Sequence, residues 1–136
     1  MTTYVLDSSA ALRYIDDGPG ADRVEEVLGA CATLRAELCI SAVQWGEIAG
    51  KLRKHFGPAD QNRILSSFLP SEASIVPASA ERAVRAAGLK VDRNIAYADS
   101  FALELAMESP DHVLVTADYG FKPVEDLAKI EFLPAK

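Results

Sequence analysis

The sequence has few cysteines, no long apolar run and no excess of positive charge. Its two cysteines, Cys31 and Cys39, have no second Cys/His pair near them, so their spacing does not match a zinc site. In a reducing compartment such residues are more often buried, unreactive thiols. No apolar stretch approaches the roughly 20 residues of a membrane span, and the first residues lack the basic segment of a secretory signal. We therefore expect a cytoplasmic protein with no membrane association.

The chain also lacks internal repeats, low-complexity tracts and linkers. With 136 residues, 49% of them hydrophobic, it is expected to form a single domain over residues 1–136. The net charge of −6 argues against a general nucleic-acid coat protein, which would be basic. It does not exclude a nucleic-acid enzyme whose acidic residues are neutralised by bound metal, provided that a local basic strip or a basic partner is present.

Short apolar segments alternate with helical patterns along the chain. The segments expected to form strands are residues 3–6, 38–40, 74–76, 113–115 and 130–133. This alternation predicts an α/β fold with a central, mainly parallel sheet and right-handed crossovers.

The helices are expected to have recognisable starts and ends. Residues 10–15 and 21–28 form the first two, and Ser41 with Gln44 resembles a capping box at the start of the third. Gly57-Pro58 then separates two helices that make a helical hairpin.

Two later helices are expected between the third and fourth strands. Ser79 caps a helix that runs to Leu89, with Gly88 helping to end it. Residues 95–107 form a helix that is apolar on nearly every side and therefore enclosed. Glu104 and Glu108 lie off the face of that helix that carries Asp99, and we expect both to be solvated.

Four acidic residues stand out by their positions. Asp7 and Asp118 directly follow expected strands, where open parallel sheets place their sites. Asp99 begins the enclosed helix, where its charge needs compensation, and Glu47 lies on the helix that follows the second strand. Carboxylates gathered from distant segments are typical ligands of Mg²⁺ or Mn²⁺. Individually, Asp7 and Asp118 are equally typical of helix caps and turns, and Glu47 of a solvated helix surface.

Taken together, these positions resemble a known family. The segments V-L-D-S-S-A-A-L-R-Y-I, S-A-V-Q-W-G-E-I, A-Y-A-D-S-F-A-L-E-L-A and V-L-V-T-A-D-Y-G-F are similar to the four signature blocks of PIN domains, and most similar to those of VapC toxins. The resemblance runs from Tyr4 to Phe121, and in the second block only Ser41 and Glu47 carry it.

This resemblance implies a three-layer α/β/α sandwich and a Mg²⁺- or Mn²⁺-dependent endoribonuclease. Asp7, Glu47, Asp99 and Asp118 would be the catalytic, metal-holding acids, and Ser9 and Thr116 would support them. The resemblance also implies a homodimer and a cognate VapB-like antitoxin. His55 and His112 have no acidic partner in the signature blocks, so a metal-free mechanism based on histidine is not expected.

Basic residues follow the metal-site candidates by one or two helical turns. Arg13, Lys51, Arg53 and Lys54 are candidates to hold RNA phosphates, although a solvated basic face is an equal interpretation.

Other function classes fit the sequence less well or remain open. A haloacid-dehalogenase-type phosphatase would have a second Asp where this chain has Ser9, and a receiver domain would have an adjacent acidic pair and a late lysine. Two alternatives remain: a PIN-like RNA-processing nuclease without an antitoxin, and a non-cleaving scaffold that binds metal, RNA or protein.

Overall fold

A five-stranded parallel sheet forms the centre of the molecule, and the computed structural model describes all residues 1–136. The strand order is β3-β2-β1-β4-β5, and every neighbouring pair is parallel. The strands are β1 (Thr3–Leu6), β2 (Glu37–Ser41), β3 (Ser74–Val76), β4 (His112–Thr116) and β5 (Lys129–Phe132). All five strands expected from the sequence are present, and no strand end lies more than one residue from its expected position.

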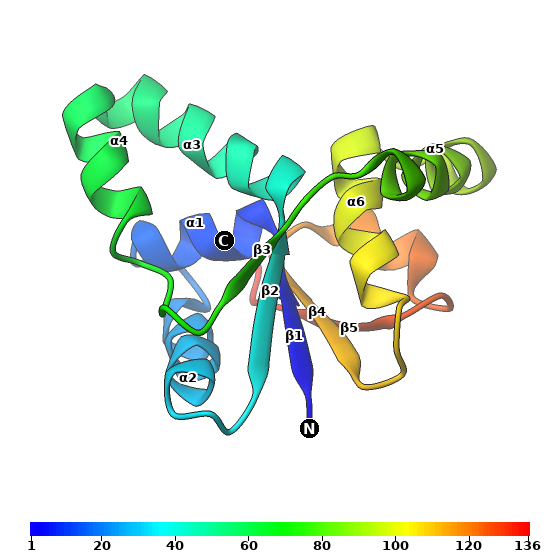
Figure 1. The fold of residues 1–136 in the computed structure, drawn as a ribbon, viewed down its shortest axis with the longest axis horizontal. Coiled ribbons are helices and arrows are strands. Elements are labelled where there is room, and N and C mark those ends of the chain that lie inside the picture. Colours follow the sequence, from blue (N-terminus) through cyan, green and yellow to red (C-terminus); the bar gives the residue numbers. More distant parts are fainter.

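Helices cover both faces of the sheet, which gives three layers (Figure 1). One face carries α1, α2 and α3, and the other carries α5, α6 and a short 3₁₀ helix, η1. The helices are α1 (Ser8–Ile15), α2 (Ala21–Ala32), α3 (Ala42–Phe56), α4 (Pro58–Leu65), α5 (Ala80–Arg93), α6 (Tyr97–Ala106) and η1 (Tyr119–Val124). The expected α/β/α sandwich is confirmed, and so is the helical hairpin, formed by α3 and α4.

The alternation of side chains along each strand builds two separate cores. In β1, Leu6 packs with α1, α2 and α3, whereas Val5 packs with α6 on the opposite face. In β4, Val115 and Leu114 are divided between the two cores in the same way. Because β1 and β4 are buried on both faces, their central residues are consecutively apolar, which is the pattern of a parallel sheet.

The middle of the sheet contains its topological switch point. β1 pairs with both β2 and β4, and the chain builds outward from β1 first through β2 and β3 and later through β4 and β5. Crossovers therefore diverge at the carboxyl ends of β1 and β4, where such sheets leave a crevice. Asp7 and Asp118 lie just beyond these two strand ends.

The end of α5 differs from the expectation. The helix continues past Gly88 to Arg93 and ends at Asn94, which adopts a left-handed conformation with φ of 55°. Gly88 lies on an exposed part of the helix, where its cost relative to alanine is only about 1 kcal/mol. α2 is also longer than expected and continues to Ala32, which buries Cys31.

Glu104 is buried, which contradicts the expectation that it is solvated. Only 4% of its side chain is exposed, and it accepts hydrogen bonds from Arg82 at 2.9 Å and Arg85 at 2.8 Å. Glu108 also pairs with Arg82. The periodicity of the apolar residues cannot reveal this arrangement, because the compensating arginines lie on α5, a different segment of the chain.

No helix is both long enough and apolar enough to span a membrane.

The thiol of Cys39 is half-buried, and burial raises its pKa to about 11. This thiol is therefore protonated at neutral pH, which agrees with the expected unreactive cysteine.

The first prediction concerns the buried ion network between α5 and α6. Replacing Glu104 by alanine leaves Arg82 partly buried without its carboxylate partner, so we expect the free energy of unfolding to fall by about 2–3 kcal/mol. Urea unfolding followed by circular dichroism measures this change. Glu125→Ala is the matched control, because Glu125 forms an exposed pair with Lys122 and should cost less than about 1 kcal/mol. Equal effects of the two substitutions would contradict the prediction.

Candidate metal centre

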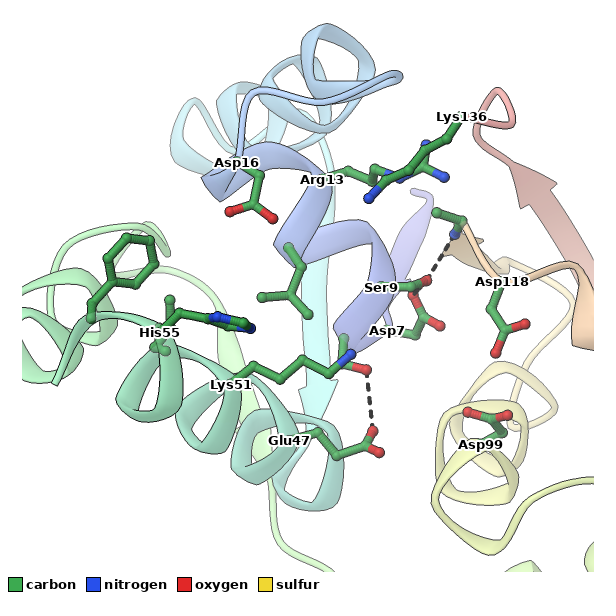
Figure 2. A pocket seen from close by; sticks show the side chains of 15 residues that line it. Asp7, Ser9, Arg13, Asp16, Glu47, Lys51, His55, Asp99, Asp118 and Lys136 are labelled. Carbon is green, nitrogen blue, oxygen red and sulfur yellow. Dashed lines mark hydrogen bonds between the residues drawn. The ribbon is translucent and has the colours of Figure 1, made fainter. Parts of the chain in front are cut away.

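A cavity of about 830 Å³ lies at the carboxyl ends of β1 and β4, and all four acidic candidates line it (Figure 2). The complete lining comprises Asp7, Ser8, Ser9, Leu12, Arg13, Asp16, Glu47, Lys51, Leu52, His55, Phe56, Asp99, Ala117, Asp118 and Lys136. The four carboxylates come from the start of α1, from α3, from the first turn of α6 and from the loop after β4. The fold thus brings together residues that are far apart in sequence.

Asp7 is the most deeply buried of the four, with 1% of the residue exposed. It is the N-cap of α1: its Oδ1 accepts a hydrogen bond from the backbone N–H of Ala10 at 3.0 Å. The same oxygen accepts from the Ser9 hydroxyl at 2.8 Å, and Oδ2 accepts from the Thr116 hydroxyl at 2.8 Å. Asp7 is therefore both a helix cap and a fixed carboxylate at the wall of the cavity.

Ser9 and Thr116 hold Asp7 from two sides and connect it to the loop after β4. Each hydroxyl has a single proton to donate, and each donates it to Asp7. Their oxygens in turn accept from the backbone N–H groups of Ala117 and Asp118, both at 2.9 Å. The two residues that the sequence singled out as supports thus lie in direct contact with an acidic candidate.

Asp99 lies in the first turn of α6, opposite Asp7 across the cavity (Figure 2). The rest of this helix is enclosed as expected, with every residue from Ser100 to Ala106 buried. Since the body of α6 is packed into the core, the position of Asp99 is set by the packing of the whole helix.

Glu47 and Asp118 complete the group from more exposed positions. Glu47 lies one turn into α3, and its Oε1 accepts a hydrogen bond from the Ser8 hydroxyl at 3.1 Å. Asp118 caps η1 by accepting from the N–H of Gly120 at 2.8 Å. Gly120 permits this approach, because a Cβ at that position would lie 2.9 Å from Oδ1 of Asp118.

No cationic side chain forms an ion pair with any of the four carboxylates. Burial raises the pKa of Asp7 to about 6, and its hydrogen bonds only partly oppose that effect. Burial also raises the pKa of Asp99 to about 7, with the negative charges of Asp118, Asp7 and Glu47 adding to it. The site therefore gathers four acidic side chains that no direct ion pair neutralises.

The donor atoms of this site suit a hard divalent cation. Carboxylate and hydroxyl oxygens line it, and these are the ligand types that Mg²⁺ and Mn²⁺ prefer. No group of three or more Asp, Glu, His or Cys side chains is close enough to hold an ion by itself. Mg²⁺ is commonly held by only one or two carboxylates together with water, so the residues present fit such an ion.

The basic candidates occupy different positions relative to the cavity. Lys51 lines it and forms no ion pair, whereas Arg53 and Lys54 are exposed and do not line it. Arg13 lines it but is largely buried, and its Nη1 donates to the backbone oxygens of Pro19 and Pro134, both at 2.7 Å.

Several residues near the site were missed by sequence reasoning. Lys136 and Asp16 line the cavity, and so does His55, which the sequence gave no reason to include. Gln44 does not form the expected capping box: Ser41 accepts from the N–H of Val43, and the Gln44 amide contacts other segments. No signal in the sequence identifies these residues, because their positions depend on tertiary contacts.

A comparison with protein families identifies the family of this chain. The profile of the PIN domain matches residues 4–127. The chain belongs to the PIN domain family. No curated protein sequence matches the chain closely.

Solved structures of VapBC complexes and of a VapC toxin share the fold over almost their full length. VapBC2 from Rickettsia felis, solved bound to a DNA fragment from its promoter, matches with a TM-score of 0.76 and 21% identity over 98% of this chain and 100% of that one. VapC20 from Mycobacterium tuberculosis, described as a sarcin-ricin loop cleaving toxin, matches with a TM-score of 0.72 and 12% identity over 96% of this chain and 99% of that one. VapBC-1 from nontypeable Haemophilus influenzae matches with a TM-score of 0.67 and 17% identity over 96% of this chain and 98% of that one. At these identities the similarity establishes the fold alone.

The second prediction concerns the pH dependence of stability in metal-free buffer. The pKa of Asp99 is about 7 in the folded protein and near 3.8 in the unfolded chain, so the folded state binds the proton more tightly. The contribution of this proton to stability is full below pH 3.8 and is lost as the pH rises through 7. Asp99→Asn removes the ionised form, and we expect it to stabilise the protein at pH 8 by on the order of 1 kcal/mol, because the half-exposed carboxylate keeps part of its hydration.

Urea unfolding with EDTA at pH 8 and at pH 4.5 tests this expectation. The stabilisation by Asp99→Asn should shrink towards zero at pH 4.5, where the wild-type carboxyl group is already protonated. Asp111→Asn is the control, because Asp111 is exposed and does not line the cavity. A variant that is less stable than the wild type at pH 8 would contradict the electrostatic account.

Proposed function

We propose that the protein is a Mg²⁺- or Mn²⁺-dependent endoribonuclease that acts in the cytoplasm as the toxin of a VapBC-type toxin–antitoxin pair. The observation that carries the proposal is the convergence of Asp7, Glu47, Asp99 and Asp118 on one cavity, where none of them forms an ion pair. Membership of the PIN domain family supports it.

In this proposal the four carboxylates hold the ion, directly or through water, and Ser9 and Thr116 hold Asp7 in place. The bound ion would lower the pKa of a coordinated water and offset the charge that builds on the phosphoryl oxygens. Asp7 would be a fixed ligand at the wall of the cavity, because its side chain caps α1 and both of its carboxylate oxygens accept hydrogen bonds. Glu47, Asp99 and Asp118 face it from the other sides of the cavity (Figure 2). Hydrolysis would leave a 5′-phosphate and a 3′-hydroxyl.

A polyanionic substrate needs positive charge close to the carboxylates. Lys51 lines the same cavity and has no ion-pair partner, so it is available to a phosphate next to the scissile one. Lys136 lines the cavity as well. Arg53 and Lys54 lie outside the cavity and would contact RNA further along the strand, whereas Arg13 serves mainly to hold backbone carbonyl groups.

The proposed partners are RNA, a VapB-like antitoxin and a second copy of the chain. Solved structures with this fold from Rickettsia felis and Salmonella typhimurium are VapBC complexes bound to DNA. A basic segment of an antitoxin would find unneutralised carboxylates in the cavity. A homodimer is proposed from the family resemblance.

The third prediction tests the activity directly. Mapping of new RNA 5′-phosphate ends in cells after induction of the wild type should give discrete ends that are absent with Asp99→Asn, because that variant loses one carboxylate of the cluster. Asp111→Asn should give the wild-type pattern. Identical patterns for the wild type and Asp99→Asn, with both proteins soluble and no antitoxin co-expressed, would favour the non-cleaving scaffold. Capture of an antitoxin by the tagged protein would separate a toxin from an RNA-processing nuclease.

The fourth prediction separates Lys51 from other surface lysines. Lys51→Glu places a negative charge in the cavity, and we expect kcat/KM for RNA cleavage to fall at least about 10-fold and the salt dependence of RNA binding to weaken by about one phosphate contact. Lys54→Glu should have a smaller effect. Lys90→Glu on α5 is the matched control and should behave as the wild type. Equal activity of the Lys51 and Lys90 variants would exclude a phosphate contact by Lys51.

A further inference from the structure

Gln44 is fully buried beside the candidate metal centre without lining its cavity. It lies in the first turn of α3, and its side-chain amide makes two short hydrogen bonds to other segments. Its Oε1 accepts from the backbone N–H of Ser8 at 2.7 Å, and its Nε2 donates to the backbone oxygen of Ala98 at 2.7 Å. One amide therefore spans the starts of two other helices, α1 and α6.

The two backbone groups that Gln44 contacts adjoin two of the acidic candidates. Ser8 follows Asp7, and Ala98 precedes Asp99. The N–H of Ser8 is one of the groups that a helix start leaves without an intrahelical partner, and the Gln44 amide satisfies it. The separation between the Asp7 and Asp99 backbones is thus fixed by a side chain that touches neither carboxylate.

Gln44 is also linked to the third acid, Glu47. Both lie on α3, and the Ser8 residue whose N–H contacts Gln44 donates its hydroxyl to Glu47 at 3.1 Å. The starts of α1 and α6 and the first turns of α3 are therefore connected through the Gln44 amide.

The chemistry of this position restricts which side chain can occupy it. The contacts require an acceptor for Ser8 and a donor for Ala98 at the same point, which also fixes the orientation of the amide. A glutamate would add another negative charge beside the cluster and could not donate when ionised, and a lysine could not accept. A neutral amide meets both demands without changing the charge of the site.

We propose that Gln44 is a positioning residue that sets the spacing of Asp7 and Asp99 and thereby the affinity of the site for a divalent cation. This inference rests on the metal site of the proposed function. A residue that only held the helices together would affect the stability of the fold but not the metal affinity of the folded protein.

The experiment is a Mn²⁺ titration followed by the electron paramagnetic resonance signal of free Mn²⁺, without RNA, on protein shown to be folded by circular dichroism. Gln44→Met keeps the size of the side chain and removes both hydrogen bonds, and we expect the dissociation constant for Mn²⁺ to rise about 10- to 100-fold. Gln44→Asn is a second variant that keeps a neutral amide too short to reach both partners. We expect it to weaken Mn²⁺ binding in the same direction.

Gln61→Met is the matched control. Gln61 on α4 also donates its amide to a backbone oxygen of α3, that of Ala49 at 2.9 Å, but it does not line the cavity, and Ala49 is not adjacent in sequence to an acidic candidate. We expect it to lower stability and leave Mn²⁺ affinity within about twofold of the wild type.

The outcomes separate this inference from the function on which it rests. If the wild type binds Mn²⁺ and both Gln44 variants bind it as tightly as Gln61→Met does, the positioning role is overturned and the proposed metal site stands. If the wild type itself does not bind Mn²⁺, both are overturned. Weaker binding by the Gln44 variants alone supports the positioning role.

Discussion

The constraint on which the site depends is the gathering of four acidic side chains at the carboxyl ends of β1 and β4, where none of them forms an ion pair. Asp7 is buried there at the cost of a raised pKa, and the hydrogen bonds of Ser9 and Thr116 hold it in that position. Retaining an uncompensated carboxylate in the interior is unfavourable for the folded protein alone. A bound divalent cation gives this arrangement a physical reason.

Helix α6 allows a direct comparison between a site carboxylate and a buried acid outside the site. α6 carries both Asp99 and Glu104. Glu104 is almost fully buried and is neutralised by two arginines of α5, so its charge is satisfied within the protein. Asp99 is only half-buried, yet no arginine or lysine pairs with it, and its pKa rises to about 7. The contrast between the two acids indicates that the missing counter-charge at Asp99 is a property of the site and not of the helix.

Most of the fold follows from local sequence patterns, because short apolar segments and helix caps act within a few residues of one another. The strands, the helical hairpin and the enclosed α6 were predicted for this reason, and Asp7 and Asp118 were placed by the rule for parallel sheets. The roles of Gln44 and Glu104 were not predicted, because each depends on a partner from a distant segment. The end of α5 was misjudged because an exposed glycine does not necessarily end a helix, whereas Asn94 in a left-handed conformation does.

The central claim is that the carboxylates of this cavity bind a divalent cation, directly or through water, and diffraction from crystals grown with Mn²⁺ tests it most directly. The account predicts an anomalous peak within about 2.5 Å of oxygens of Asp7 and at least one other acid of the cluster, with water completing the coordination. A well-ordered cavity without an anomalous peak at millimolar Mn²⁺, or Mn²⁺ bound only elsewhere on the molecule, would contradict it.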